Sequence, residues 1–248
     1  MPRTWPQIAA ALLLLVVGGL AQAAETIEIG AEDDWYPYGG QVRGEAAGLG
    51  PDLVRASFAA VGIEVRFQVM PYARCLQLVK QGRLIACNQP ARTAETEQAV
   101  LWPDRPLFSA RSLIYARAPS DLRGLSASGL AGRRVAVTNG YEYGSEFDGN
   151  RAIQREVATR EISVFRMLAA SRVDYAVAYE KAAELYFKQH PSEFGGRFQA
   201  VGQTAVTDMY CAFSKLHPQG QQYLARFNEG FARIRANGEL KAIEARWR

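Results

Sequence analysis

Two kinds of hydrophobic spacing alternate along the first half of the chain. Residues 26–30 and 63–69 place apolar side chains at every second position, which is typical of half-buried strands, and residues 84–87 form a short apolar strand. Residues 52–61 and 72–80 repeat apolar positions at helical spacing, and a glycine follows each of them. This order of elements predicts a parallel sheet covered by helices.

The second half of the chain repeats this order. Residues 134–138 form an apolar strand that ends in an Asn-Gly turn, and residues 174–179 form another. Between these strands, residues 147–155 and 164–170 have helical spacing. The segments "QGRLIAC" and "ASRVDYAVA" each combine a helix end, an arginine and an apolar strand. We therefore expect two similar α/β halves.

Extended apolar segments connect the predicted halves. Residues 112–116 lie between the two halves and residues 209–213 follow the second, so each can cross from one half to the other. Residues 222–247 carry apolar side chains at helical spacing and are predicted to pack as helix on one half. The chain is thus expected to cross into the second half and to return.

The first 23 residues have a different pattern. Residues 1–7 contain one arginine and no acid, residues 8–20 are almost wholly apolar, and Ala21-Gln22-Ala23 is a small-x-small cleavage pattern. This combination predicts a secretory signal peptide over residues 1–23, cleaved near Ala23, and a periplasmic mature chain. An uncleaved membrane anchor is the alternative, although the apolar run is short for a bilayer span.

Charge and composition exclude several classes of function. The formal net charge is +4, and the basic residues are scattered, so neither a nucleic-acid footprint nor a membrane-binding patch is indicated. The sequence shows no nucleophile elbow and no metal-ligand spacing, and its two histidines, His190 and His217, both precede prolines. We expect no cofactor and no metal. The length suits one large or two small domains.

Three cysteines occur in a chain expected to meet an oxidising compartment. Cys75 lies early in a predicted helix and Cys87 at the end of the strand that follows, so the two side chains meet if that strand runs back along the helix. Such a bridge would stabilise the fold by roughly 3 kcal/mol in the chain-entropy model. Cys211 is then expected to be a buried free thiol. Three free thiols are the alternative.

Five longer motifs span nearly the whole mature chain. They are "IEIGAEDDWYPYGG", "GLGPDLVRASFAAVGIEVRF", "RPLFSARSLIYAR", "LAGRRVAVTNGYEYG" and "FARIRANGELKAIEARW". In order and spacing they resemble the periplasmic solute-binding proteins of the polar amino acid type. The resemblance implies an α/β fold of two lobes, each a mostly parallel sheet flanked by helices, joined by two hinge strands. Residues 25–112 and 210–248 would form lobe one, and residues 113–209 lobe two.

In such a fold, solutes bind where the ends of parallel strands meet helix N-termini. The resemblance places an acid and solute-facing aromatic residues after the first strand, at Glu32, Trp35 and Tyr38. Core packing of the two aromatic residues is the alternative. No histidine or regular ligand spacing supports a metal site among the acids of residues 32–34.

The second segment of the expected site follows the strand at residues 84–87. Asn88 and Gln89 are candidates for direct polar contacts with the solute. Members of the resembled family usually place an arginine further on, where its guanidinium pairs with the α-carboxylate of an amino acid. That position here is Thr96, and Arg92 lies one helical turn earlier. Arg92 either reaches the cleft from this displaced position or is a solvated charge.

The third segment is the turn after the strand at residues 134–138. Thr138 and Gly140 allow a close approach of backbone to solute, and Tyr141 and Glu142 stand where relatives often have serine or threonine. Both residues would change the size and charge of the pocket. An ordinary turn with exposed tyrosines is the alternative.

The fourth segment ends the strand at residues 174–179. The resembled amino acid binders place an aspartate there, which accepts the α-ammonium group of the solute. This chain has Tyr179 at that position, with Glu180 next to it as a possible substitute. A phenol accepts a hydrogen bond but does not neutralise a cation at neutral pH. Both charged contacts of an amino acid headgroup are thus displaced or missing.

The expected function is capture of a small polar, amino-acid-like solute by lobe closure. The resemblance implies a monomer that delivers the solute to an inner-membrane ABC permease. The aromatic residues of the expected site favour a solute with a flat, apolar or cationic face. An enzyme resembling a secreted cyclohexadienyl dehydratase, with Glu142 or Glu180 as general acid, is one alternative. A protein that presents its ligand to a membrane receptor is another.

Overall fold

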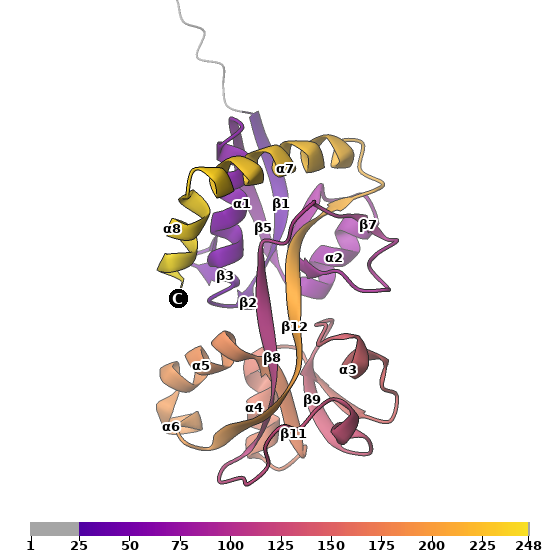
Figure 1. The fold of residues 1–248 in the computed structure, drawn as a ribbon, viewed down its shortest axis with the longest axis vertical. Coiled ribbons are helices and arrows are strands. Elements are labelled where there is room, and N and C mark those ends of the chain that lie inside the picture. The colour runs from indigo at the N-terminus through magenta and orange to yellow at the C-terminus, as the bar shows by residue number, and fades with distance from the viewer. Residues whose placement is uncertain (1–24, 248) are drawn as a thin grey trace, which may run out of the picture.

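The computed structural model describes residues 25–247, so the predicted signal peptide, residues 1–23, lies outside it. The chain forms two α/β lobes connected by two long strands (Figure 1). This is the two-lobed architecture expected from the sequence. Among the described residues, no helix has the length and apolarity needed to cross a membrane.

Lobe one contains the N-terminal elements and the C-terminal helices. Its elements are β1 (Glu25–Glu32), α1 (Leu49–Ala59), β5 (Ile63–Met70), α2 (Tyr72–Lys80), β6 (Ala86–Ala91), β7 (Val100–Leu101), α7 (Gly220–Ala236) and α8 (Glu239–Arg246). A small antiparallel sheet of β2 (Asp34–Trp35), β3 (Gly39–Val42) and β4 (Glu45–Ala47) follows β1. Strand β1 pairs in parallel with both β5 and β6, so the carboxyl ends of β1 and β6 point toward the same edge.

Lobe two is built from the middle of the chain. Its elements are a short 3-10 helix (Ser128–Leu130), β9 (Arg134–Thr138), α3 (Ser145–Gly149), β10 (Gln154–Ala158), α4 (Glu161–Ala169), β11 (Tyr175–Tyr179), α5 (Glu180–Gln189) and α6 (Pro191–Phe194). Strand β9 pairs in parallel with β10 and β11. The expectation of one helix over residues 147–155 is wrong, because helix α3 ends at Gly149 and strand β10 begins at Gln154.

Two hinge strands join the lobes into one continuous sheet. Strands β8 (Phe108–Arg117) and β12 (Phe198–Ser214) pair antiparallel along most of their length and are the long strands between the lobes in Figure 1. The sheet order is β10-β9-β11-β8-β12-β6-β1-β5. Strand β8 pairs with β11 of lobe two, while β12 pairs with β6 of lobe one. Inside the hinge, the hydroxyls of Ser112 and Thr204 are 2.6 Å apart.

A disulfide joins α2 to β6 in lobe one. The Cα atoms of Cys75 and Cys87 are 5.8 Å apart, which is a usual span for such a bridge. Gly30 of β1 lies against it, since a Cβ there would come within 2.5 Å of the Cys75 sulfur. Cys211 is free and buried, and burial raises the pKa of its thiol. The structure therefore contains the pair expected from the sequence.

Thiol titration tests this assignment. We expect one reactive thiol in the denatured, non-reduced mature protein and three after reduction, with none before reduction in a Cys211→Ala control. Replacing Cys75 and Cys87 together by serine should lower the free energy of unfolding by roughly 3 kcal/mol, because the unfolded chain regains the entropy of an open loop. Three reactive thiols in the non-reduced wild type would contradict the bridge.

Candidate functional site

Residues from both lobes line a small cavity beside β6 and at the carboxyl ends of β1 and β11. Its volume is about 10 Å³, which leaves room for no more than about one water molecule. The lining residues are Glu32, Trp35, Tyr72, Gln89, Tyr141, Glu142, Tyr179 and Met209. Six of them were expected from the sequence, whereas Tyr72 and Met209 were not. In this arrangement of the lobes, the cavity is thus too small for an amino-acid-sized solute.

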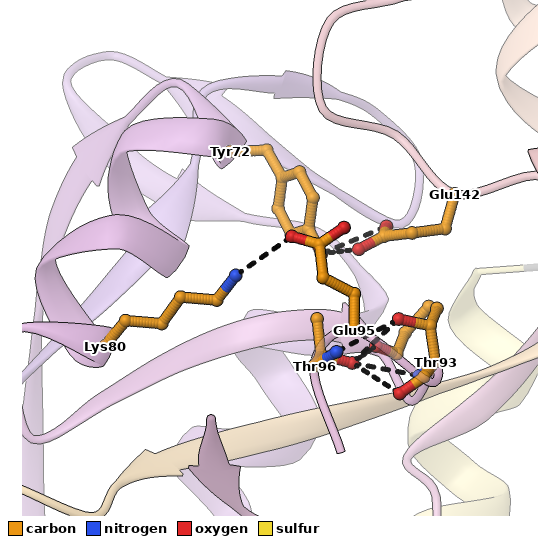
Figure 2. Close-up of polar contacts among 7 residues, drawn as sticks. Tyr72, Lys80, Thr93, Glu95, Thr96 and Glu142 are labelled. Carbon is orange, nitrogen blue, oxygen red and sulfur yellow. Dashed lines mark hydrogen bonds and ion pairs between the residues drawn. The ribbon is translucent and has the colours of Figure 1, made fainter. Parts of the chain in front are cut away.

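Two hydrogen bonds between tyrosines and carboxyl groups connect the lobes across this cavity. The Tyr72 hydroxyl of lobe one donates to the Glu142 carboxyl of lobe two, at 2.8 and 3.1 Å from its two oxygens (Figure 2). The Tyr141 hydroxyl of lobe two donates to the carboxyl of Glu32 in lobe one. Within lobe two, the Tyr179 hydroxyl donates to the Glu142 carbonyl at 2.5 Å.

Aromatic rings pack around the same cavity. Trp35 stacks on Tyr38 with ring centroids 4.5 Å apart, and the edge of Tyr179 from the other lobe meets it at 4.8 Å. Tyr141 lies 5.8 Å from Tyr72 and 6.1 Å from Trp35, again across the seam. Tyr38 is outside the lining and stacks on Phe108 of the hinge at 5.3 Å. Trp35 therefore lines the cavity, while Tyr38 packs against Trp35 outside the lining.

Burial raises the pKa of the carboxyl groups at the seam. For Glu142 the pKa is raised to about 8, with the loss of hydration as the largest cause and the Tyr72 hydrogen bond acting against it. Glu32 is shifted in the same direction by burial, with the Tyr141 hydrogen bond again opposing the shift. A carboxylate held away from water without a cation is unstable relative to its protonated form. Both groups therefore hold a proton more readily here than in water.

Glu161 is a further buried acid at this edge, and the sequence did not single it out. It begins helix α4, has no exposed surface, and accepts a hydrogen bond from the Tyr179 backbone N–H at 2.8 Å. Burial raises the pKa of Glu161 to about 8. An acid in the first turn of a helix is common, because it faces the positive end of the helix dipole. Had β10 been predicted from the sequence, Glu161 would have followed the end of a strand, which is where site residues were expected.

The segment after β6 contributes less to the cavity than expected. Arg92 is half-exposed and donates to the Glu97 carboxylate at 2.5 and 2.6 Å, with its guanidinium 5.9 Å from the Trp102 ring. Thr96 is buried and its hydroxyl donates to the Ala91 carbonyl at 3.0 Å, so it holds the loop together. Neither residue lines the central cavity.

Asn88 and Gln89 lie within β6, further into a strand than the sequence predicted, and both are buried. The Asn88 amide lies 3.4 Å from the Gln89 side-chain oxygen. Gln89 has a φ of 77°, which is strained for a residue with a Cβ. Its side chain fits between Gly39 and Gly50, since a Cβ at either glycine would come within 2.1 and 2.6 Å of it, respectively. Gln89 is thus held in one position at the cavity wall.

Two larger hollows flank the central cavity. The wider one, about 1110 Å³, lies between α2 and the loop after β6 on one side and α3 on the other, and it includes Arg92, Thr96 and Gly140. Its basic Lys80 is paired with Glu95 at 3.4 Å (Figure 2). The narrower one, about 300 Å³, includes Glu32, Thr138 and Glu161. No group of described residues has the arrangement of a metal site.

Comparisons with known proteins agree with this geometry. The family model for bacterial extracellular solute-binding proteins, family 3, matches residues 27–248. No curated protein matches the chain. A solved ancestral arginine-binding protein bound to arginine is 22% identical, with a TM-score of 0.76 over 90% of this chain and 97% of that one.

Two further solved structures have the same fold. One is a histidine kinase sensor domain with similarity to periplasmic binding proteins, 24% identical, with a TM-score of 0.77 over 90% of this chain and 95% of that one. The other is the arginine-, lysine-, histidine-binding protein ArtJ from Geobacillus stearothermophilus, 17% identical, with a TM-score of 0.75 over the same shares. The family model spans nearly the whole mature sequence, and the chain therefore belongs to the bacterial extracellular solute-binding proteins of family 3.

Proposed function

We propose that the chain is a periplasmic substrate-binding protein that captures a small polar solute between its lobes. The observation that carries this proposal is the cavity at the seam, where buried polar and aromatic side chains of both lobes meet. Such a set of groups is accessible only when the lobes separate and is enclosed when they close. Solutes that contact both lobes would shift an open population toward the closed one.

Delivery to an inner-membrane ABC permease completes the proposed role. One structural neighbour is named as the substrate binding protein of an amino acid ABC transporter, and others are arginine-binding proteins, which supports an amino-acid-like solute. We assign residues 25–112 and 210–248 to lobe one and residues 113–209 to lobe two. Residues 1–23 would be the cleaved signal peptide, and the mature protein would act as a monomer.

A sensory role is the second candidate, because one structural neighbour is a histidine kinase sensor domain. In that role the closed form would be read by a membrane receptor instead of a permease. Catalysis has weaker support. Of its two candidate acids, Glu180 is paired with Arg111 at 2.5 Å and lies outside the cavity lining. Glu142 does line the cavity, so a substrate-depletion assay with any bound compound separates turnover from binding.

A thermal-shift screen of amino acids, amines and small carboxylates tests capture, because a ligand of the folded state raises the melting temperature. For any hit, Trp35→Leu should weaken binding about tenfold, since it removes the aromatic face at the cavity. Arg92→Ala should change the affinity less than about twofold, since Arg92 is already paired with Glu97. A loss in Arg92→Ala as large as in Trp35→Leu would place Arg92 among the solute contacts.

The buried acids predict a pH-dependent stability. Glu142 has a pKa of about 8 in the closed protein against its ordinary 4.5, so the folded state binds an extra proton between these values. Its contribution is therefore fully present below about pH 4.5 and is lost as the pH rises through about 8. We expect the melting temperature of wild type to fall from pH 6 to pH 9 more steeply than that of Glu142→Gln.

Glu184→Gln provides the matched control, because Glu184 is an exposed acid on α5. Its melting temperature should follow the wild-type pH profile. Small-angle scattering over the same pH range should show the unliganded lobes separating as the pH rises, because opening returns Glu142 to water. A Glu142→Gln profile identical to wild type would assign the pH dependence to other groups.

A further inference from the structure

Acids outnumber bases at the solute site. Among the described residues that line the central cavity and the narrower hollow, the acids are Glu32, Asp33, Asp34, Glu142 and Glu161. The basic side chain in these linings is Arg160, and it forms an ion pair with Asp34 at 3.1 Å. The remaining carboxyl groups therefore have no cationic partner among the described residues of the protein's own lining. A cationic solute would supply it.

Glu161 lines the narrower hollow and has one buried acceptor oxygen without a partner in the described part of the chain. One of its oxygens accepts the Tyr179 N–H, while the other has no hydrogen-bond partner among the described residues. The Thr138 hydroxyl, which lines the same hollow, also lacks a partner within residues 25–247. A buried polar group without a partner costs about 1–3 kcal/mol. Two such groups on one hollow indicate a place for a hydrogen-bond donor.

Glu161 supplies an acid close to Tyr179, which has a neutral side chain. The sequence led us to expect an acid at the end of β11, where an ammonium group would bind, and the residue there is Tyr179. The carboxyl of Glu161 binds the backbone N–H of this same residue. Helix α4 therefore brings a carboxyl group to the end of β11 from a different part of the chain.

The aromatic rings suit the same kind of solute. Trp35, Tyr72, Tyr141 and Tyr179 line the cavity together with two carboxyl groups. The faces of Trp and Tyr attract organic cations, and the attraction grows when water is excluded. Rings and acids together therefore favour a positively charged group over a neutral or anionic one.

Among the described residues, the linings of the central cavity and the narrower hollow offer no unpaired cation to a carboxylate. Thr96 occupies the position where an arginine was expected, and Arg92 is bound to Glu97 outside the central lining. At the central cavity, the buried donors without a partner among the described residues are the Trp35 indole nitrogen and the Gln89 amide nitrogen, and both are neutral. They can bind a neutral oxygen, but they do not balance the charge of a carboxylate.

We propose that the solute is a small organic cation without a carboxylate, whose ammonium or guanidinium group is held by Glu161 and Thr138 beside the aromatic rings. This inference rests on the proposed capture of a solute between the lobes. It differs from recognition of an α-amino acid, because the headgroup would be recognised by its positive charge alone. A bound cation would also stabilise the ionised form of the buried acids.

Calorimetric titration of the mature protein with arginine and with agmatine, which is arginine without its carboxylate, tests the inference directly. We expect agmatine to bind at least as tightly as arginine, since removing the carboxylate removes a charge that the acids repel. The panel also contains 1,4-diaminobutane and choline as cations, with glutamine and glutamate as neutral and anionic amino acids. This comparison uses the wild-type protein, so it does not depend on the folding of any variant.

Glu161→Gln tests the assigned residue. Glutamine keeps an oxygen for the Tyr179 N–H and removes the charge, so we expect at least a tenfold loss of affinity for the tightest cation. Glu184→Gln, an exposed acid on α5, should leave the affinity unchanged. Circular dichroism and the melting temperature establish that both variants are folded.

The possible outcomes separate this inference from the proposed function. Binding of arginine more than tenfold tighter than agmatine would overturn the inference and leave solute capture in place. Binding of glutamine or glutamate with none of the cations would do the same, as would unchanged affinity in folded Glu161→Gln. If no compound in the panel or in the wider thermal-shift screen binds, both the inference and the proposed function fail.

Discussion

Buried carboxyl groups at the seam between the lobes control the energetics of this site. Glu32 and Glu142 face tyrosine hydroxyls from the opposite lobe, and these hydroxyls satisfy the hydrogen bonding of the acids without neutralising their charge. Because burial raises the pKa of both acids, protonation favours the arrangement of the lobes seen here. A solute that brings a positive charge replaces these neutral contacts with stronger ones, since hydrogen bonds to charged groups contribute about 1.5–3 kcal/mol against about 1 kcal/mol for neutral pairs.

In the proposed capture, the hinge would convert this local chemistry into movement of whole lobes. Strands β8 and β12 continue one sheet from lobe one into lobe two, and their pairing is irregular in two places within β12, between Ala200 and Gly202 and between Gln203 and Ala205. Such irregularities allow a strand to bend and twist more strongly. A hinge of this kind can flex while each lobe keeps its own packed core. The free energy that closes it must then come from contacts at the seam, where the acids and aromatic rings lie.

Much of the fold followed from hydrophobic spacing, because most strands are buried on at least one side. Strands β1, β9 and β11, helices α1 and α2 and the Cys75–Cys87 bridge agree with the sequence-based expectations, and β6 lies slightly later than expected, at Ala86–Ala91. Strand β10 was not predicted from hydrophobic spacing, because it is an edge strand whose residues Gln154, Glu156 and Val157 are exposed. Its sequence lacks the apolar alternation of a strand, and Phe147 and Ile153 nearby fit a helix equally well.

The candidate site was predictable only where it follows the recognised strands. Two of the predicted residues, Glu32 and Tyr179, end strands β1 and β11. Gln89 lies in β6, and Tyr141 follows β9 after a short turn. All four line the cavity. Tyr72 was missed because a tyrosine at a helix start carries no signal of its own, and its role depends on Glu142 of the other lobe. The sequence position of Arg92 suggested a possible solute contact, but nothing in the pattern showed that Glu97 would bind its guanidinium.

Glu161 shows why charge has to be located in space before specificity is argued. By alignment with the expected motif, the end of β11 has lost its acid, and a neutral solute would seem to fit Tyr179. In the folded chain, helix α4 places a carboxyl on the backbone N–H of that same tyrosine, so an acid that a bound cation can ionise remains at this edge. The carboxylate partner expected near Thr96 has no such replacement among the residues that line the cavity. The ammonium group of an amino acid would thus still find an acid, whereas its carboxylate would find no cation among the residues that line the cavity. This asymmetry favours a cation over a zwitterion.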